Sequence, residues 1–359
     1  MKTNVFKDKK VLVTGHTGFK GSWLAAWLYE LGADVYGLSL DVPTNPSHYS
    51  LFNQQVLNEE FIDISDQEKV KGFIDDVEPD FLFHLAAQPI VLDSYENPLN
   101  TFLTNSIGTA NVLDALRVIN KNCVAVMITS DKCYDNQELT RGYLEEDRLG
   151  GKDPYSGSKG AAELIIKSYT ESFFKKEESN VRVAVGRAGN VIGGGDWAPH
   201  RIIPDCIRAW SEDRVSEIRN PFSTRPWQHV LEPLGGYLRL AEYLNNDKSL
   251  NGQTFNFGPS GDSDFTVGEL VEAISKAWEG SSWSDVGNKN DAHYEAGLLK
   301  LNCEKAEKEL SWKSVLTFEE TALWTGDWYY KYYKKSKDEA LDFTSKQILE
   351  YMKLTSTRL

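Results

Sequence analysis

Two side chains near the middle of the sequence have the types and spacing needed to move a proton from a hydroxyl group. Tyr155 and Lys159 lie four residues apart, so on a helix they share one face. A neighbouring cation favours the phenolate, and the pattern predicts a base that takes a proton from a substrate hydroxyl while hydride leaves the carbon. The spacing recurs in the lysine-rich tail, at Tyr330–Lys334 and Tyr333–Lys337, so context must select the pair.

Ser130 lies 25 residues before Tyr155, after an apolar run read as a buried strand, 124–128. Parallel sheets bind ligands at the carboxyl ends of their strands, and this context favours Tyr155 over the matches in the tail. Asp131 and Lys132 come next, so a carboxyl and an ammonium are predicted at the same edge. An exposed ion pair in a turn is the alternative for these two residues.

A glycine-rich turn lies near the start of the chain. Gly15, Gly18 and Gly21 follow the first apolar run and open a helix-like segment. Glycine permits a tight turn and a close approach of backbone to a pyrophosphate, and a helix N-terminus presents free N–H groups to that anion. The turn therefore predicts a dinucleotide site. A glycine turn without a ligand is the alternative.

The adenosine end of such a site usually has an acid after the second strand, bonded to the ribose. That slot falls at Ser39, with Asp41 two residues later, and no nearby Arg could pair with a 2′-phosphate, which favours NAD over NADP. Asp63, followed by Ile64, comes after the third strand, where a carboxylate can accept from the adenine amino group. A capping or turn role is an equal alternative for Asp63.

These residues need a scaffold that brings distant strands to one edge. Apolar runs alternate with helix-like segments through the first half, which is typical of a parallel sheet covered on both faces. The predicted strands are 11–14, 35–38, 81–85, 124–128, 181–185 and, later in the chain, 254–257. The predicted helices are 22–31, 66–77, 105–119, 155–174 and an amphipathic helix over 324–335.

After Gly189 the regular alternation of apolar runs and helix-like segments ends, because prolines interrupt the next segment. We therefore predict an α/β fold with two parts. A Rossmann-like doubly wound parallel sheet in residues 1–189 would bind NAD. A smaller mixed α/β substrate-binding domain would occupy most of residues 190–359, with some segments returning to the first domain.

Composition limits the partners. Asp and Glu number 53 against 39 Lys and Arg, a net charge of −14, which argues against a general nucleic-acid-binding protein. The four cysteines are scattered without a C-x-x-C pair, so neither a metal site nor a disulfide framework is predicted. With no apolar run of membrane-spanning length and no signal-peptide pattern at the N-terminus, we expect a cytoplasmic protein that does not bind a membrane.

Four strings together resemble the extended short-chain dehydrogenases/reductases, namely Thr14–Gly21, His84–Gln88, Asn105–Thr109 and Tyr155–Lys159. Within that group the chain is similar to the nucleotide-sugar 4,6-dehydratases, most closely to those that act on CDP-glucose. The closer similarity rests on the first of these strings and on 129–136, 187–197 and 225–230, and the similarity as a whole covers residues 8–330.

The resemblance implies an NAD-dependent hydro-lyase reaction with no net oxidation. The sugar C4 is oxidised, water is lost across C5 and C6, and the hydride returns to C6. From CDP-glucose the product would be CDP-4-keto-6-deoxy-D-glucose, in deoxysugar biosynthesis of the kind used for O-antigen and lipopolysaccharide. The resemblance also implies a homodimer or homotetramer, paired through the predicted helices 105–119 and 155–174.

By resemblance, Tyr155 takes the C4 hydroxyl proton, Lys159 lowers its pKa and holds the nicotinamide ribose, and Ser130 bonds the C4 oxygen. Asp131 protonates the departing C6 hydroxyl. Lys132 stands where many relatives carry a glutamate, and it either removes the C5 proton or stabilises the enolate electrostatically. The implied cofactor-binding set is Gly15, Thr17, Gly18, Phe19, Lys20, Gly21, Asp63, Ile64, Leu85, Ala86, Ala87, Asn105, Tyr155 and Lys159. The implied substrate-binding set is Asn190, Arg201 and Arg225.

Other functions stay open at this point. A nucleotide-sugar 4-epimerase shares the Tyr/Lys/NAD core but needs no acid to expel the 6-hydroxyl, so Asp131 discriminates against it. A nucleotide-sensing regulator without catalysis would be expected to lack Tyr155 or Lys159, and both are present. For Arg201 and Arg225 a surface ion pair is the alternative.

Overall fold

The computed structural model describes residues 4–52, 58–259, 264–287 and 299–358. Its centre is a seven-stranded sheet whose neighbouring strands are all parallel, in the order β11-β6-β5-β4-β1-β2-β3. The strands are β1 (Lys10–Thr14), β2 (Asp34–Ser39), β3 (Asn58–Phe61), β4 (Phe81–His84), β5 (Cys123–Ile128), β6 (Val181–Ala188) and β11 (Thr254–Phe257). This order confirms the doubly wound sheet, with its switch point between β1 and β4.

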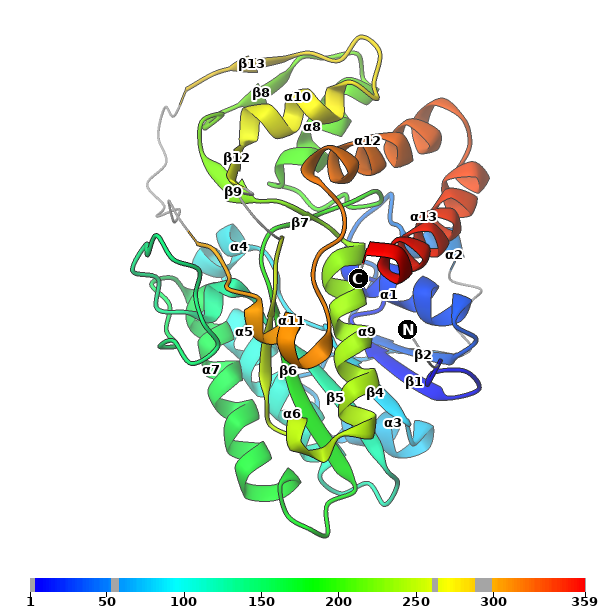
Figure 1. Cartoon of the computed structure of the whole chain (residues 1–359), viewed down its shortest axis with the longest axis vertical. Helices are drawn as coiled ribbons and strands as arrows, with labels where there is room; N and C mark the ends of the chain where they lie inside the picture. Colours follow the sequence, from blue (N-terminus) through cyan, green and yellow to red (C-terminus); the bar gives the residue numbers. More distant parts are fainter. Residues whose placement is uncertain (1–3, 53–57, 260–263, 288–298, 359) are drawn as a thin grey trace.

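Helices cover both faces of the sheet (Figure 1). One face carries α1 (Phe19–Glu30) and α9 (Leu231–Asn246), with α13 (Lys337–Arg358) packed outside α1. The other carries α3 (Gln67–Val77), α6 (Thr109–Leu116) and α7 (Pro154–Tyr169). Val11 and Val13 of β1 join the first core and Leu12 joins the second, and all three are fully buried. This is why the strands read as continuous apolar runs.

A second region lies above the sheet in the view of Figure 1. Its helices are α8 (Ile202–Ser211), α10 (Val267–Ser275) and α12 (Phe318–Lys334). Its short strand pairs are β7 (Val191–Ile192) with β10 (Gln228–His229), β8 (Ser216–Ile218) with β13 (Trp283–Asp285), and β9 (Thr224–Pro226) with β12 (Asp264–Thr266). The shorter helical pieces of the chain are α2 (Tyr49–Phe52), α4 (Val91–Glu96), α5 (Pro98–Phe102), α11 (Glu304–Leu310), η2 (Leu103–Gly108), η3 (Asp131–Cys133), η4 (Thr170–Phe174) and η5 (Lys248–Leu250).

Several helices begin or end at residues other than those predicted. Helix α1 begins at Phe19, three residues earlier than predicted, so Gly21 lies inside its first turn. The predicted helix 105–119 is the π-helical turn η2 followed by α6, and 155–174 is α7 followed by the π-helical turn η4. Strand β11 joins the edge of the main sheet and α9 packs on β5 and β6, although both follow residue 189. The two-domain division stays a proposal.

Within the described residues, the helices include none that is both long and apolar enough to cross a membrane. The stretch 324–335 falls largely in α12, where Trp328 and Tyr329 are fully buried while Lys334 is exposed. This confirms the amphipathic helix.

Candidate active site

The predicted catalytic residues meet at the carboxyl end of β5. Ser130 caps the 3₁₀ turn η3 and donates its hydroxyl to Asp131 Oδ1 at 2.8 Å. Tyr155, in the first turn of α7, is hydrogen-bonded to Ser130. The phenol and the carboxyl, which are 24 positions apart in the chain, therefore share one hydroxyl between them. Lys132 follows as a half-buried side chain.

The electrostatics of the phenol differ from the prediction. Burial raises the pKa of Tyr155 to about 12, and the Ser130 hydrogen bond opposes this only in part. Lys159 Nζ lies 6.0 Å from the centre of the Tyr155 ring. In the chain alone, burial therefore outweighs the predicted lowering of the phenol pKa by Lys159, because loss of solvent disfavours the phenolate more than its neighbours favour it.

Two lysines share the site, Lys159, which is buried, and Lys20, which is half-buried. Burial lowers the pKa of Lys159 to about 8. Burial also lowers the pKa of Lys20 to about 8, and the nearby positive charges of Lys159 and Arg201 lower it further, while Asp131 opposes them. Lys20 comes from the glycine-rich turn, so the turn contributes a cation beside the predicted proton-transfer groups.

The glycine-rich turn has the close packing that a dinucleotide cradle needs. Gly15 has φ +75°, and a Cβ there would lie 2.7 Å from Ala86 N. A Cβ on Gly21 would lie 2.0 Å from Gly15 O, so helix and turn touch through backbone alone. Gly18 begins α1 without a side-chain cap, which leaves the first N–H groups for an anion. These features fit a bound pyrophosphate.

The slot predicted for a ribose acid is occupied by a hydrogen-bonded cluster. Ser39 Oγ lies 2.9 Å from His16 Nδ1, and His16 Nε2 lies 2.7 Å from Glu59 Oε2. Thr17 donates its hydroxyl to Asp41 O at 2.6 Å. An acid, Glu59 of β3, therefore contacts this turn through His16.

The remaining predicted cofactor residues differ in their exposure and in their contacts. Asp63 is exposed and accepts from Ser65 N at 2.8 Å, so in this structure it closes a turn. Ile64 is buried against η2, where a Cβ on Gly108 would meet its side chain. Asn105 is buried in η2 and donates to Ser158 Oγ at 2.9 Å, which ties η2 to α7. The half-buried members that line the turn are Phe19, Leu85, Ala86 and Ala87.

Of the predicted substrate residues, Arg201 lies near Lys20 and Tyr155. Arg201 pairs with Asp196 at 2.8 Å, and this carboxylate raises the pKa of Arg201. Arg225, half-buried in β9, donates to Thr224 O at 2.8 Å. Asn190 follows β6, and its carbonyl accepts from Gln228 N at 3.2 Å.

A small cavity of about 50 Å³ opens beside Asp131, with Gly189, Gln228 and Lys300 in its lining. A Cβ on Gly189 would lie 3.0 Å from Asp131 Oδ2, so glycine leaves room for the carboxylate.

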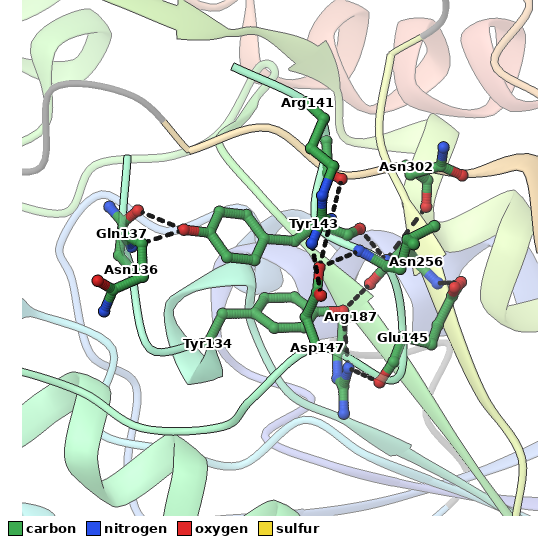
Figure 2. A network of polar contacts seen from close by, with 12 residues as sticks. Tyr134, Asn136, Gln137, Arg141, Tyr143, Glu145, Asp147, Arg187, Asn256 and Asn302 are labelled. Atoms are coloured by element: carbon green, nitrogen blue, oxygen red, sulfur yellow. Dashed lines mark hydrogen bonds and ion pairs between the residues drawn. The ribbon is translucent and has the colours of Figure 1, made fainter. Parts of the chain in front are cut away.

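A buried network holds the catalytic strand end against α7. Glu163 pairs twice with Arg187 of β6, at 2.8 and 2.9 Å, and each side chain is 3% exposed. Thr129, the residue before Ser130, donates its hydroxyl to Glu163. Arg187 Nη1 donates to Tyr134 OH at 2.7 Å, and Figure 2 shows the continuation through Asn256. The segments that carry the acid and the phenol are thus cross-linked behind the site.

Sequence reasoning missed four residues that contribute to the site. His16 is part of the glycine-rich string, and its polar side chain between two glycines was the available signal. Gln228 lies inside the string 225–230, yet nothing in its spacing marked it. Gly189 and Lys300 reach the cavity only through folding.

The chain is similar in sequence to a known protein family and to a curated enzyme. The sequence profile of the family described as GDP-mannose 4,6 dehydratase matches residues 12–323. The CDP-glucose 4,6-dehydratase of Salmonella typhimurium is 43% identical over 358 residues, which cover 98% of this chain and 99% of that protein.

Two solved structures share the fold. An epimerase from Methanothermobacter thermautotrophicus superposes with a TM-score of 0.78 at 21% identity, covering 96% of each chain. A dTDP-glucose 4,6-dehydratase from Bacillus anthracis, in complex with NAD, superposes with a TM-score of 0.74 at 22% identity, covering 92% of this chain and 99% of that one.

Proposed function

Because the chain belongs to the GDP-mannose 4,6-dehydratase family, we propose that it is an NAD-dependent hydro-lyase that converts CDP-D-glucose to CDP-4-keto-6-deoxy-D-glucose. The observation that carries the proposal is the likeness to the Salmonella enzyme across nearly the whole of both chains. The placement of a carboxyl beside the phenol supports it, because dehydration needs an acid that a 4-epimerase does not need.

The turn and the two lysines fit NAD. Backbone N–H groups at the start of α1 would hold its pyrophosphate, and Lys159 would hold its nicotinamide ribose. When bound, NAD takes hydride from C4 of the sugar and returns it to C6. The chain's task is to align the hexose, exclude water and move protons.

Tyr155 would accept the C4 hydroxyl proton through the hydrogen-bonded Ser130–Tyr155 pair. Its pKa of about 12 means that the resting phenol is protonated at neutral pH. Cationic charge brought near the ring is therefore required, since a nearby positive charge favours the phenolate. Arg201 already favours the phenolate in this structure, and Lys159 and Lys20 would add to that charge.

Elimination would use the adjacent turn. A ketone at C4 acidifies the C5 proton, and Asp131 would protonate the departing C6 oxygen. Lys132, the half-buried residue after Asp131, would either take the C5 proton or stabilise the enolate. Asn190, Arg201 and Arg225 would bind the diphosphate and the nucleotide ribose, for which the planar arginine fork is suited.

Assembly and location belong to the same proposal. The surface of η2 and α7 exposes Leu103, Ile107 and Leu164, which supports a homodimer paired through these elements. We place the enzyme in the cytoplasm, in the synthesis of deoxysugars for O-antigen or lipopolysaccharide. Residues 1–189 would bind mainly NAD, and residues 190–359 mainly the nucleotide sugar.

The proposal is tested by incubating purified protein with CDP-glucose and NAD. A product lighter by one water, with the alkali-induced absorbance of a 4-keto-6-deoxy sugar, is expected. A product of unchanged mass would indicate the 4-epimerase instead, and no turnover of CDP-glucose would refute the proposed substrate.

A further inference from the structure

Gln228 is held rigidly next to the substrate side of the site. It lies in β10, which pairs with β7 in the register Gln228–Val191, and its backbone N–H donates to Asn190 O. Its side chain is 1% exposed. Because its backbone is hydrogen-bonded and its side chain is buried, Gln228 has little freedom to move toward another partner.

The orientation of its amide is set by a carbonyl. Gln228 Nε2 donates to Phe257 O at 3.1 Å, and a carbonyl can only accept, so the NH₂ group must face Phe257. Oε1 then points away from Phe257, and it has no hydrogen-bond partner among the described residues. A buried acceptor without a donor is unfavourable and calls for an explanation.

The orphaned oxygen alone does not mark a ligand. Gln347 of α13 shows the same arrangement, because it is 1% exposed, donates Nε2 to Trp324 O and leaves Oε1 unpartnered. The difference is location. Gln228 lines the cavity that also contains Asp131 and Lys300, and Lys300 is already ion-paired with Asp264.

The chemistry of the leaving group supplies the missing donor. When Asp131 protonates the C6 oxygen of the hexose, the hydroxyl's own hydrogen still needs an acceptor, because a hydroxyl both donates and accepts. We infer that Gln228 Oε1 accepts that hydrogen bond. Asp131 and Gln228 would then bind the two sides of the 6-hydroxyl, one as donor and the other as acceptor. Gln228 transfers no proton; it recognises the group that leaves as water and fixes its orientation. This inference rests on the proposed function.

The test is a double-mutant cycle that removes either the acceptor or the hydroxyl. Binding of CDP-glucose and of CDP-6-deoxyglucose, which lacks the hydroxyl, is measured with NAD present for wild type and Gln228→Met. Methionine keeps the length of the side chain without its amide. Wild type should lose roughly tenfold in affinity for the 6-deoxy ligand, and Gln228→Met, in which only Asp131 still binds the hydroxyl, should lose clearly less than that.

Gln347→Met is the matched control, and it should keep the wild-type preference for the 6-hydroxyl. Gln228→Leu repeats the cycle if the methionine variant does not fold. A 6-deoxy penalty that is the same in wild type and in the Gln228 variants would overturn the inference, as would an equal loss for both ligands, which is the mark of a structural role. Wild type that fails to bind or dehydrate CDP-glucose would instead refute the proposed function.

Discussion

The buried pair of Glu163 and Arg187 offers a sharp test of how the catalytic segments are held together. In Glu163→Gln the side chain keeps its shape and loses its charge, so the Arg187 guanidinium stays buried without a counter-ion. Both side chains are 3% exposed, and breaking a buried pair from one side costs about 3–5 kcal/mol in unfolding free energy. Because Thr129 and Tyr134 belong to the same network, we also expect turnover to fall.

The measurement is urea unfolding followed by tryptophan fluorescence, with kcat recorded in parallel. The control is Glu304→Gln, which removes one partner of an exposed pair with Lys308 and should leave the free energy of unfolding nearly unchanged. Replacing both Glu163 and Arg187 by apolar side chains should recover much of the loss, since neither charge is then left buried. A loss below about 1 kcal/mol in Glu163→Gln would show that solvent reaches Arg187 and that the network does not hold the site.

Asp131→Asn should bind NAD as wild type does but slow loss of water by about 10² or more, measured by product formation, and unchanged turnover would remove Asp131 from the mechanism. Burial lowers to about 3 the pKa values of three histidines whose ordinary value is 6.5, namely His48, His84 and His229. Their contribution to stability is full above pH 6.5 and is lost as the pH falls, by roughly 1.4 kcal/mol each at pH 5.5. Burial raises the pKa of Glu232 to about 7, and this group opposes the loss of stability from the histidines by about 2 kcal/mol. Urea unfolding at pH 7.5 and 5.5 should therefore show a lower free energy of unfolding at pH 5.5. Equal or greater stability at pH 5.5 would contradict the prediction. Leu164→Glu on α7, 59% exposed, should give monomers in light scattering, whereas Leu349→Glu on α13, 53% exposed, should leave the assembly unchanged; dimers of the first variant would place the interface elsewhere.

Local patterns in the sequence predicted the ranges of six of the seven strands of the sheet, all but β3, and the chemistry of its edge. Buried parallel strands need apolar side chains on both faces, and this requirement is legible in runs such as 124–128. The glycine spacing was equally legible, because only backbone fits where Gly21 approaches Gly15. The ends of the helices could not be predicted as well from the sequence, since the π-helical turn at Asn105 depends on hydrogen bonds to Gln88 and Ser158 in other segments.

Only the tertiary structure decided how the site residues act on one another. The i,i+4 spacing of Tyr155 and Lys159 predicted a lowered phenol pKa, but burial, which depends on every surrounding element, raises it instead. In the same way Gln228 carries no signal in its own segment. Its side-chain oxygen is left without a partner because the carbonyl of Phe257 in β11 takes its NH₂ group, and folding alone brings Gln228 into the lining of the cavity that Asp131 also lines. Residue type and spacing fix what a side chain can do, whereas solvent exclusion and the positions of distant partners set its energy, and these arise only when the chain closes on itself.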